Sequence, residues 1–274
     1  MIVRRVMMLL FCILLLNAGL RAEAPGTLQE FFQNLVRNYG VSGLPNADDL
    51  SSIEDHVAGM PAEDIREAMP AIVAALEYPN ESVQSYAASA VFVISRRSDS
   101  SDLLKPYIGA IMGLFRTGSA RLCSLAGMTI VGMKPSPPPE VVPALLSLIG
   151  RRDLDNAAQV SALAAVVRVA PDNPEAVSAV VRFMSRPLDS NTRLTVLNAI
   201  RSSHLTDVRV RDAVIANLQQ SEPGVKIAAI NALSRMGPVA VGQAEPDLQK
   251  LLQHESESPD VKAAAKKALR QIGK

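Results

Sequence analysis

The sequence predicts an all-α protein built from repeated helical hairpins, and three observations support this fold class. Apolar residues make up 48% of the chain, but aromatic residues only 4%, and Trp is absent. A core with so few rings must consist of small aliphatic side chains, which suit closely packed helices better than a β-sandwich. One apolar frame recurs six times, and an apolar helix precedes each copy. The 274 residues are enough to bury a substantial core.

The recurring frame predicts the second helix of each hairpin. Small or apolar residues stand mostly at offsets 0, +4, +7, +8 and +11, which lie on one helical stripe. Offset +7 always holds Ala or Gly, so neighbouring helix backbones can approach closely. The frames begin at 83, 120, 158, 192, 225 and 261, about 36 residues apart, and their small residues are Ala90, Gly127, Ala165, Ala199, Ala232 and Ala268.

The apolar helix before each frame completes the hairpin. Four of these first helices carry a proline 13 to 15 residues before the frame begins, at Pro70, Pro106, Pro143 and Pro246. This recurrence predicts a first-turn position, where the missing N–H costs little. The expected first helices are 70–76, 104–115, 140–149, 175–184, 208–218 and 245–252.

The pattern resembles the HEAT-repeat family, including its shorter bacterial HEAT-like forms, over about residues 68–274. The resemblance is sharpest at 222–237 and 258–273, where a polar turn is followed by Val-Lys. It implies a right-handed α-solenoid of about six hairpins whose second helices line a concave face. We therefore expect residues 68–274 to form one HEAT-like repeat array.

Residues 25–67 do not fit the frame and predict a helical N-terminal cap, which would cover the apolar end of the array. Helices are expected at 27–39 and 47–58, with a Gly/Pro-containing link at 40–45. The stretch Pro-Ser-Pro-Pro-Pro at 135–139 could be a polyproline ligand. Because it falls between two repeats, a rigid turn is the favoured interpretation.

Residues 1–24 predict a secretory signal peptide. Two adjacent arginines precede an unbroken apolar run at 6–16, and small residues at Ala22 and Ala24 offer cleavage sites. The alternative is a retained membrane anchor, but such an anchor needs about 20 apolar residues. We expect export to the periplasm or the medium of a bacterium, with no stable membrane span after cleavage behind Ala22 or Ala24.

The sequence shows no catalytic pattern. His56, His204 and His254 lie far apart and lack the spacing of metal ligands. Cys123 stands between leucines and is expected to be a small buried residue rather than a nucleophile. Gly-rich phosphate loops and nucleophile elbows are also missing. We expect no enzymatic activity, no cofactor and no metal, and the balance of 28 basic against 27 acidic residues predicts no nucleic-acid surface.

Two polar columns of the repeat are candidates for binding a partner. In the resembled fold, offsets +1 and +6 lie on or beside the inner face. The alternative is that the +1 residues support the hairpin turns. The candidates are Gln84, Arg121, Gln159, Arg193, Lys226 and Lys262 at +1, with Asn198, Asn231 and Lys267 at +6.

The expected function is that of an exported, non-enzymatic scaffold or adaptor that binds another protein on its concave face. Two alternatives stay open: a HEAT-like lyase-type enzyme or tetrapyrrole-binding protein, and a passive structural module of the cell envelope. The resemblance extends to bilin lyases, although the scarcity of aromatic residues disfavours that alternative. Residues 25–100 hold 11 acidic and 4 basic residues. They form either a solvated cap surface or an acidic docking end.

Overall fold

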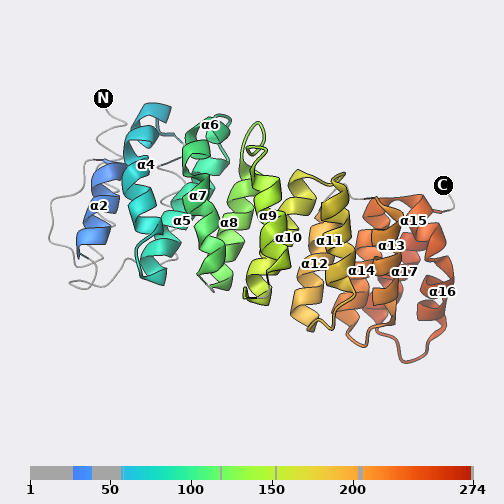
Figure 1. The fold of residues 1–274 in the computed structure, drawn as a ribbon. Coiled ribbons are helices and arrows are strands. Elements are labelled where there is room, and N and C mark those ends of the chain that lie inside the picture. Colours follow the sequence, from blue (N-terminus) through green and yellow to red (C-terminus); the bar gives the residue numbers. More distant parts are fainter. Residues whose placement is uncertain are drawn as a thin grey trace. The chain divides into compact units, whose positions relative to one another are not determined.

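The protein is all-α in the computed structural model, with 77% helix and no strand among the described residues (Figure 1). The described residues are 27–38, 57, 59–117, 119–151, 153–202 and 206–272. The expected signal peptide and the link at 40–45 lie outside them, as does nearly all of the expected helix at 47–58. The chain forms two compact units, one up to Val141 and one from Val142 onward. The expected boundary between cap and array after residue 67 stays a prediction.

Unit 1 places one helix of the expected cap against the first hairpin. Helix α2 packs on α4, and the second helices α5 and α8 pack on each other. Phe32, Ile72, Ile94 and Phe115 are fully buried between these elements. The helices are α2 (Leu28–Asn38), α4 (Ala62–Leu76), α5 (Glu81–Ser95), α6 (Ser100–Leu104), α7 (Ile108–Gly113) and α8 (Ala120–Gly132), with 3-10 turns η2 (Lys105–Tyr107) and η3 (Leu114–Arg116).

Two prolines of unit 1 depart from the expected first-turn position. Helix α4 begins at Ala62, so Pro70 lies inside it. Pro70 is exposed there, and water can therefore solvate the Arg66 carbonyl that the missing N–H leaves unpaired. The helix expected at 104–115 is instead divided between α6 and α7, and Pro106 stands in the 3-10 turn that separates them.

The junction between α5 and α8 requires a glycine. A β-carbon on Gly132 would lie 2.4 Å from Ser95 Oγ, which donates to the Phe92 carbonyl at 2.6 Å. Ser100 Oγ donates to the Ser95 carbonyl at 2.8 Å and accepts from Lys134 N–H at 2.7 Å. These contacts join the end of one hairpin to the start of the next. They explain why a glycine suits position 132.

The proline-rich stretch at 135–139 forms the connection from α8 to α9. Its first peptide bond, Lys134–Pro135, is cis, and Pro138 is buried. A polyproline ligand would have to present its prolines to a partner. Pro135 and Pro139 are exposed, so the interpretation as a turn between repeats rests on the place of the stretch between α8 and α9 and on the burial of Pro138.

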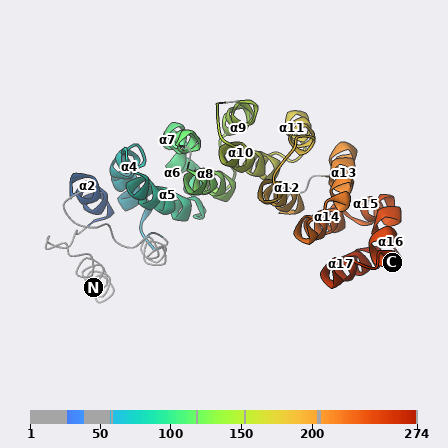
Figure 2. The same cartoon turned by 90° about the horizontal axis from the view of Figure 1, so that it is seen from below.

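Unit 2 consists of two layers of helices (Figure 2). The second helices α10, α12, α14 and α17 are successive neighbours in one layer, and the first helices α9, α11, α13 and α16 form the other. The bounds are α9 (Val141–Gly150), α10 (Asn156–Val169), α11 (Pro174–Met184), α12 (Ser190–Ser202), α13 (Val208–Ile215), α14 (Pro223–Met236), α15 (Pro238–Gln243), α16 (Glu245–Gln253) and α17 (Pro259–Leu269). A 3-10 turn, η4 (Ala216–Gln219), extends α13.

Helix α15 was not expected from the repeat. Gly237 ends α14 with a φ of 106°, a value that suits glycine, and Pro238 then occupies the first turn of a new short helix. Pro143 and Pro246 lie in the first turns of α9 and α16, as the repeat predicts.

The six hairpins and their column of small residues are confirmed. All six second helices occupy the predicted frames, each beginning at most two residues earlier. Helix α12 packs against α10 and α14, and α14 packs against α17, with a small residue at each +7 position. These six +7 residues, Ala90, Gly127, Ala165, Ala199, Ala232 and Ala268, are all buried.

Candidate partner-binding face

Each second helix of unit 2 presents one stripe of residues to solvent. The residues in a stripe lie three or four positions apart, as one side of a helix requires. We call the four stripes together the second-helix face. They consist of Ala157, Ser161, Ala164 and Arg168 on α10; Asn191, Thr195, Asn198 and Arg201 on α12; Gly224, Ile227, Asn231 and Arg235 on α14; and Asp260, Ala263, Lys267 and Arg270 on α17. Ala157, Ser161, Ala164 and Ile227 are half-buried, and the other members are exposed. Because these helices are neighbours, equivalent positions form rows across the layer.

The N-terminal ends of these helices carry acidic side chains. Asp155 accepts from Ala158 N–H at 2.7 Å, and Asp189 accepts from Thr192 N–H at 2.9 Å. Such caps satisfy the free amides of a first helical turn. The hydrogen bonds from Thr192 hold the pKa of Asp189 below its ordinary value, and hydrogen bonds likewise lower the pKa of Glu222 before α14. This edge of the second-helix face is therefore negatively charged at neutral pH.

Three of the +1 candidates donate to backbone carbonyls in the turn before their own helix. The pairs are Gln84 Nε2 with the Leu76 carbonyl (3.1 Å), Gln159 Nε2 with the Leu154 carbonyl (2.9 Å) and Lys262 Nζ with the Glu255 carbonyl (3.5 Å). These contacts support the hairpin turns, which is the alternative that the sequence left open for this column.

Other contacts of the +1 column join one hairpin to the next. Arg193 Nη1 donates to Asn217 Oδ1 at 2.8 Å, and Asn217 is buried in the turn that follows α13. Gln159 Oε1 accepts from Arg186 Nη1 at 3.0 Å, across from the end of α11. The +1 side chains thus serve as polar links between neighbouring repeats.

A further link is the ion pair between Lys226 and Glu257. Lys226 Nζ contacts Glu257 Oε2, and the two side chains are only 14% and 6% exposed. Burial alone would raise the pKa of Glu257. Hydrogen bonds from Lys226 and from Ser258 N–H outweigh this effect, and the pKa lies below its ordinary value.

The remaining sequence candidates lie on exposed surface. Asn198, Asn231 and Lys267 occupy the same register of α12, α14 and α17, and the structure brings them together as the middle row of the second-helix face. Arg121 is exposed on α8 in unit 1. Partner binding by either polar column stays a prediction.

The repeat also contains a row of arginines that the sequence analysis did not single out. Arg168, Arg201, Arg235 and Arg270 stand at the ends of the four stripes, at offset +9 or +10 of their frames. We call these four residues the arginine row. The recurrence of a basic residue at this offset was visible in the sequence. Its placement on the solvent-facing stripe became apparent only from the burial pattern.

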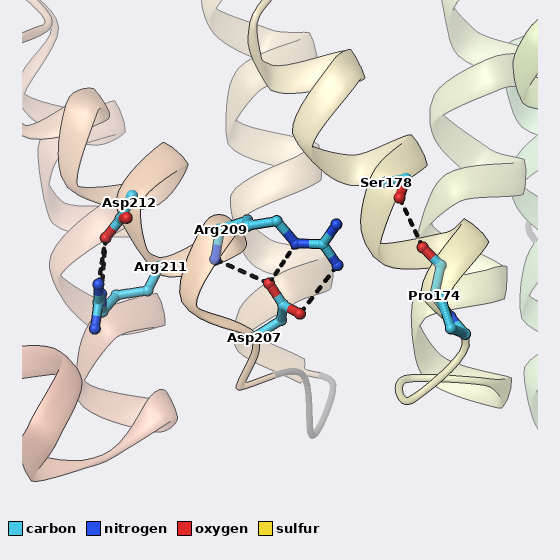
Figure 3. A network of polar contacts seen from close by, with 6 residues as sticks. All are labelled: Pro174, Ser178, Asp207, Arg209, Arg211 and Asp212. Atoms are coloured by element: carbon cyan, nitrogen blue, oxygen red, sulfur yellow. Dashed lines mark hydrogen bonds and ion pairs between the residues drawn. The ribbon is translucent and has the colours of Figure 1, made fainter.

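The first-helix layer holds a separate set of polar contacts (Figure 3). Asp207 caps α13 and accepts from Arg209 through its backbone N–H (2.8 Å) and its guanidinium (3.0 Å). The hydrogen bonds from the Arg209 side chain hold the pKa of Asp207 below its ordinary value. The other pairs drawn are Arg211 with Asp212 and Ser178 with the Pro174 carbonyl. All of these contacts join residues at most four positions apart, and the Asp207 contacts cap the start of α13.

A hollow of about 590 Å³ lies between α9 and α11. It is lined by Pro143, Leu146, Ser147, Glu175, Ser178 and Arg182. No group of three or more His, Cys, Asp or Glu within the described ranges could hold a metal ion. No described helix has both the length and the apolar character needed to cross a bilayer.

One histidine and one cysteine lie among the described residues. His254 is exposed, with Nδ1 at 3.1 Å from Ser256 Oγ, while His56 and His204 lie outside the described residues. Cys123 is fully buried and its Sγ donates to the Leu114 carbonyl at 3.7 Å. The expectation that Cys123 is a small buried residue is confirmed.

Comparison with known proteins identifies the fold. No family model matches the chain, and no curated protein matches it. An archaeal HEAT-like repeats protein from Thermococcus onnurineus NA1 is 16% identical, covering 82% of this chain and 97% of that chain with a TM-score of 0.50. The fold is a HEAT-like helical repeat. A designed armadillo repeat protein in complex with the peptide (KR)4 is 17% identical, covering 89% of this chain and 99% of that chain with a TM-score of 0.42.

The HEAT-like fold confirms the expected all-α solenoid. Folds of this class commonly mediate protein interactions. At these identities the likeness concerns the fold alone.

Proposed function

We propose that the protein is an exported, non-catalytic scaffold or adaptor that binds a segment of another protein on its second-helix face. The observation that carries this proposal is the register of the exposed stripes across α10, α12, α14 and α17. Stacked repeats of this kind provide extended binding surfaces. In the resembled family, the second helices line the concave face.

The middle row of the face suits an extended polypeptide. Packed helices lie about 8–10 Å apart. An extended chain in the polyproline II conformation advances about 3.1 Å per residue with three residues per turn, so every third side chain would meet a successive helix from the same side. The amide of Asn231 can donate and accept hydrogen bonds, and the ammonium group of Lys267 can donate to carbonyls or carboxylates. Both side chains are exposed.

Site-specific crosslinking tests the binding face. A photoreactive p-benzoylphenylalanine in place of Asn231 should crosslink to a partner protein in native extract, and excess unlabelled protein should abolish the product. The matched control places the same group at Arg182, which is exposed on α11 in the first-helix layer. We expect a saturable product from position 231 alone. Equal products from both positions, or a product only from position 182, would refute binding on the second-helix face.

Export rests on the N-terminal segment and is tested separately. The full chain, fused at its C-terminus to alkaline phosphatase and produced in a bacterial host, should give phosphatase activity. The same fusion without residues 1–24 should not. N-terminal sequencing of the exported protein should begin at Glu23 or Pro25, behind the expected cuts. An inactive full-length fusion that accumulates inside the cell would contradict export.

A further inference from the structure

The arginine row is the most regular charged feature of unit 2. Arg168, Arg201 and Arg235 stand in the last turns of α10, α12 and α14, and Arg270 caps α17. All four side chains are exposed. Because α12 contacts α10 and α14, and α14 contacts α17, the row runs along one edge of the second-helix face without a missing member.

These four arginines have no carboxylate partner among the described residues, whereas other arginines of unit 2 do. Arg151 pairs with Asp153, and Arg209 pairs with Asp207, each through two side-chain hydrogen bonds. The guanidinium groups of the arginine row are therefore available to an anion from outside. Arginine suits such a role because its planar fork binds carboxylates through two parallel hydrogen bonds.

The helix macrodipole accounts for only part of this arrangement. A cation near a helix C-terminus is stabilised by the partial negative charge of the last carbonyls. The macrodipole would stabilise a cation on any exposed side of the last turn, so it does not select one side of the helix. It does not account for four arginines at the end of the solvent-facing stripe on four successive helices.

The dimensions of the row fit a single extended chain. Four helices about 8–10 Å apart place the outer arginines about 27 Å from each other, which an extended segment of about nine residues spans. A chain in the polyproline II conformation rises about 3.1 Å per residue and repeats every three residues. In that conformation, acidic residues at every third position would all face the row and meet one arginine each.

The opposite edge of the same face argues against a nucleic acid. Asp155, Asp189, Glu222 and Asp260 lie at the N-terminal ends of these helices, exposed and acidic. A helix of 14 residues is about 21 Å long, which sets the distance from the arginine row to the acidic edge. A nucleic-acid duplex is about as wide as this distance. A duplex bound to the arginines would therefore bring phosphates near the acidic side chains, which repel them. A peptide strand is narrow enough to follow the arginines alone.

We propose that the arginine row binds an extended acidic segment of a partner protein, with carboxylates of the partner paired to Arg168, Arg201, Arg235 and Arg270. This inference rests on the proposed function and specifies the partner chemistry for one edge of the second-helix face. The attraction between exposed charges is screened by salt over about 8 Å at physiological ionic strength. Binding should therefore weaken steeply as salt is added.

Fluorescence anisotropy with defined peptides tests the proposal. The probes are labelled (Glu-Ser-Gly)4, (Gln-Ser-Gly)4 and (Lys-Ser-Gly)4, together with a labelled duplex DNA of arbitrary sequence. The intact protein should bind the Glu peptide at least tenfold more tightly than the other probes at low salt. The double variant Arg201→Glu/Arg235→Glu should lose at least tenfold in affinity for the Glu peptide.

The matched control is Arg182→Glu/Lys250→Glu, which changes net charge equally but on the first-helix layer. Its affinity for the Glu peptide should stay within twofold of the intact protein. The acidic-segment proposal would be overturned by any of three results. The protein could bind the Glu and Gln peptides equally, it could prefer DNA, or both double variants could lose equal affinity for the Glu peptide. If position 231 still crosslinks a saturable partner in that case, the proposed scaffold function stands. If that crosslink is also absent, both fail.

Discussion

Replacing Phe183 by alanine should lower the free energy of unfolding by about 3–5 kcal/mol. Phe183 lies in the last turn of α11 and is fully buried. The chain has only six phenylalanines and no tryptophan, so few other side chains bury as much apolar surface. Helix α11 contacts α10, α12 and α13, and the lost ring would leave a cavity among them. Urea unfolding followed by far-UV circular dichroism measures the change.

The ring also supports a polar link between two hairpins. The guanidinium of Arg186 lies 5.0 Å from the centre of the Phe183 ring and donates to Gln159 Oε1. Loss of the ring should therefore loosen the contact between α10 and the end of α11. Hydrogen exchange should accelerate first in these two helices, since a repeat protein couples mainly to its nearest neighbours.

The matched control for this prediction is Phe183→Leu. Leucine keeps most of the buried volume, so the loss should be smaller, about 1 kcal/mol. If the alanine and leucine variants lose equal stability, the ring does not fill the space that its burial indicates. A loss of hydrogen-exchange protection that begins in unit 1 would contradict the local coupling.

The fold was largely predictable because the repeat presents the same physical requirement six times. A second helix that packs between two others needs a small residue where the backbones meet, and Ala165, Ala199 and Ala232 meet that need. The recurring offset is therefore visible without any structure. Turn residues such as Asn80 and Ser119 also cap the helices that follow them, as their types predict.

The departures arise where one local requirement overrides the repeat. Pro70 lies inside α4 rather than in its first turn. Helix α4 tolerates it there because Pro70 is exposed, and water can solvate the carbonyl that the proline leaves unpaired. Pro106 interrupts its helix with a 3-10 turn. Gly237 with Pro238 starts the extra helix α15. A proline or glycine has several compatible environments, and sequence alone did not select among them.

The candidate site was less predictable than the fold because the sequence does not reveal which polar side chains are already paired. The sequence does not distinguish Lys226 from Lys267, yet Lys226 is half-buried against a carboxylate and Lys267 is exposed. The partner of Lys226 lies 31 residues away, in the following hairpin. Only the packing of adjacent repeats distinguishes a polar link from an available surface group.

Breaking the ion pair between Lys226 and Glu257 should strongly destabilise the fold. Lys226→Met should lower the free energy of unfolding by about 3 kcal/mol, because it leaves the Glu257 carboxylate buried without its cation. The double variant Lys226→Met/Glu257→Leu should lose much less, since neither charge then needs a partner. Urea unfolding of the two single variants and the double variant gives the coupling energy directly.

The equivalent position of the last repeat provides the control. Lys262 also stands at offset +1, but its ammonium group donates to the Glu255 carbonyl at 3.5 Å and pairs with no carboxylate in the described part of the chain. Lys262→Met should therefore cost less than about 1 kcal/mol. Losses that simply add in the Lys226/Glu257 double variant would show that the two groups do not depend on each other.

The same pair predicts how stability changes with pH. The folded state lowers the pKa of Glu257, so its contribution is fully present above the unfolded pKa of about 4.3 and is lost as pH falls through the folded value. The intact protein should lose stability on acidification from about pH 6 to pH 3. Glu257→Gln should be less stable at pH 6 and should show a smaller further loss. An equal acid loss in both proteins would mean that other carboxyl groups carry the pH dependence.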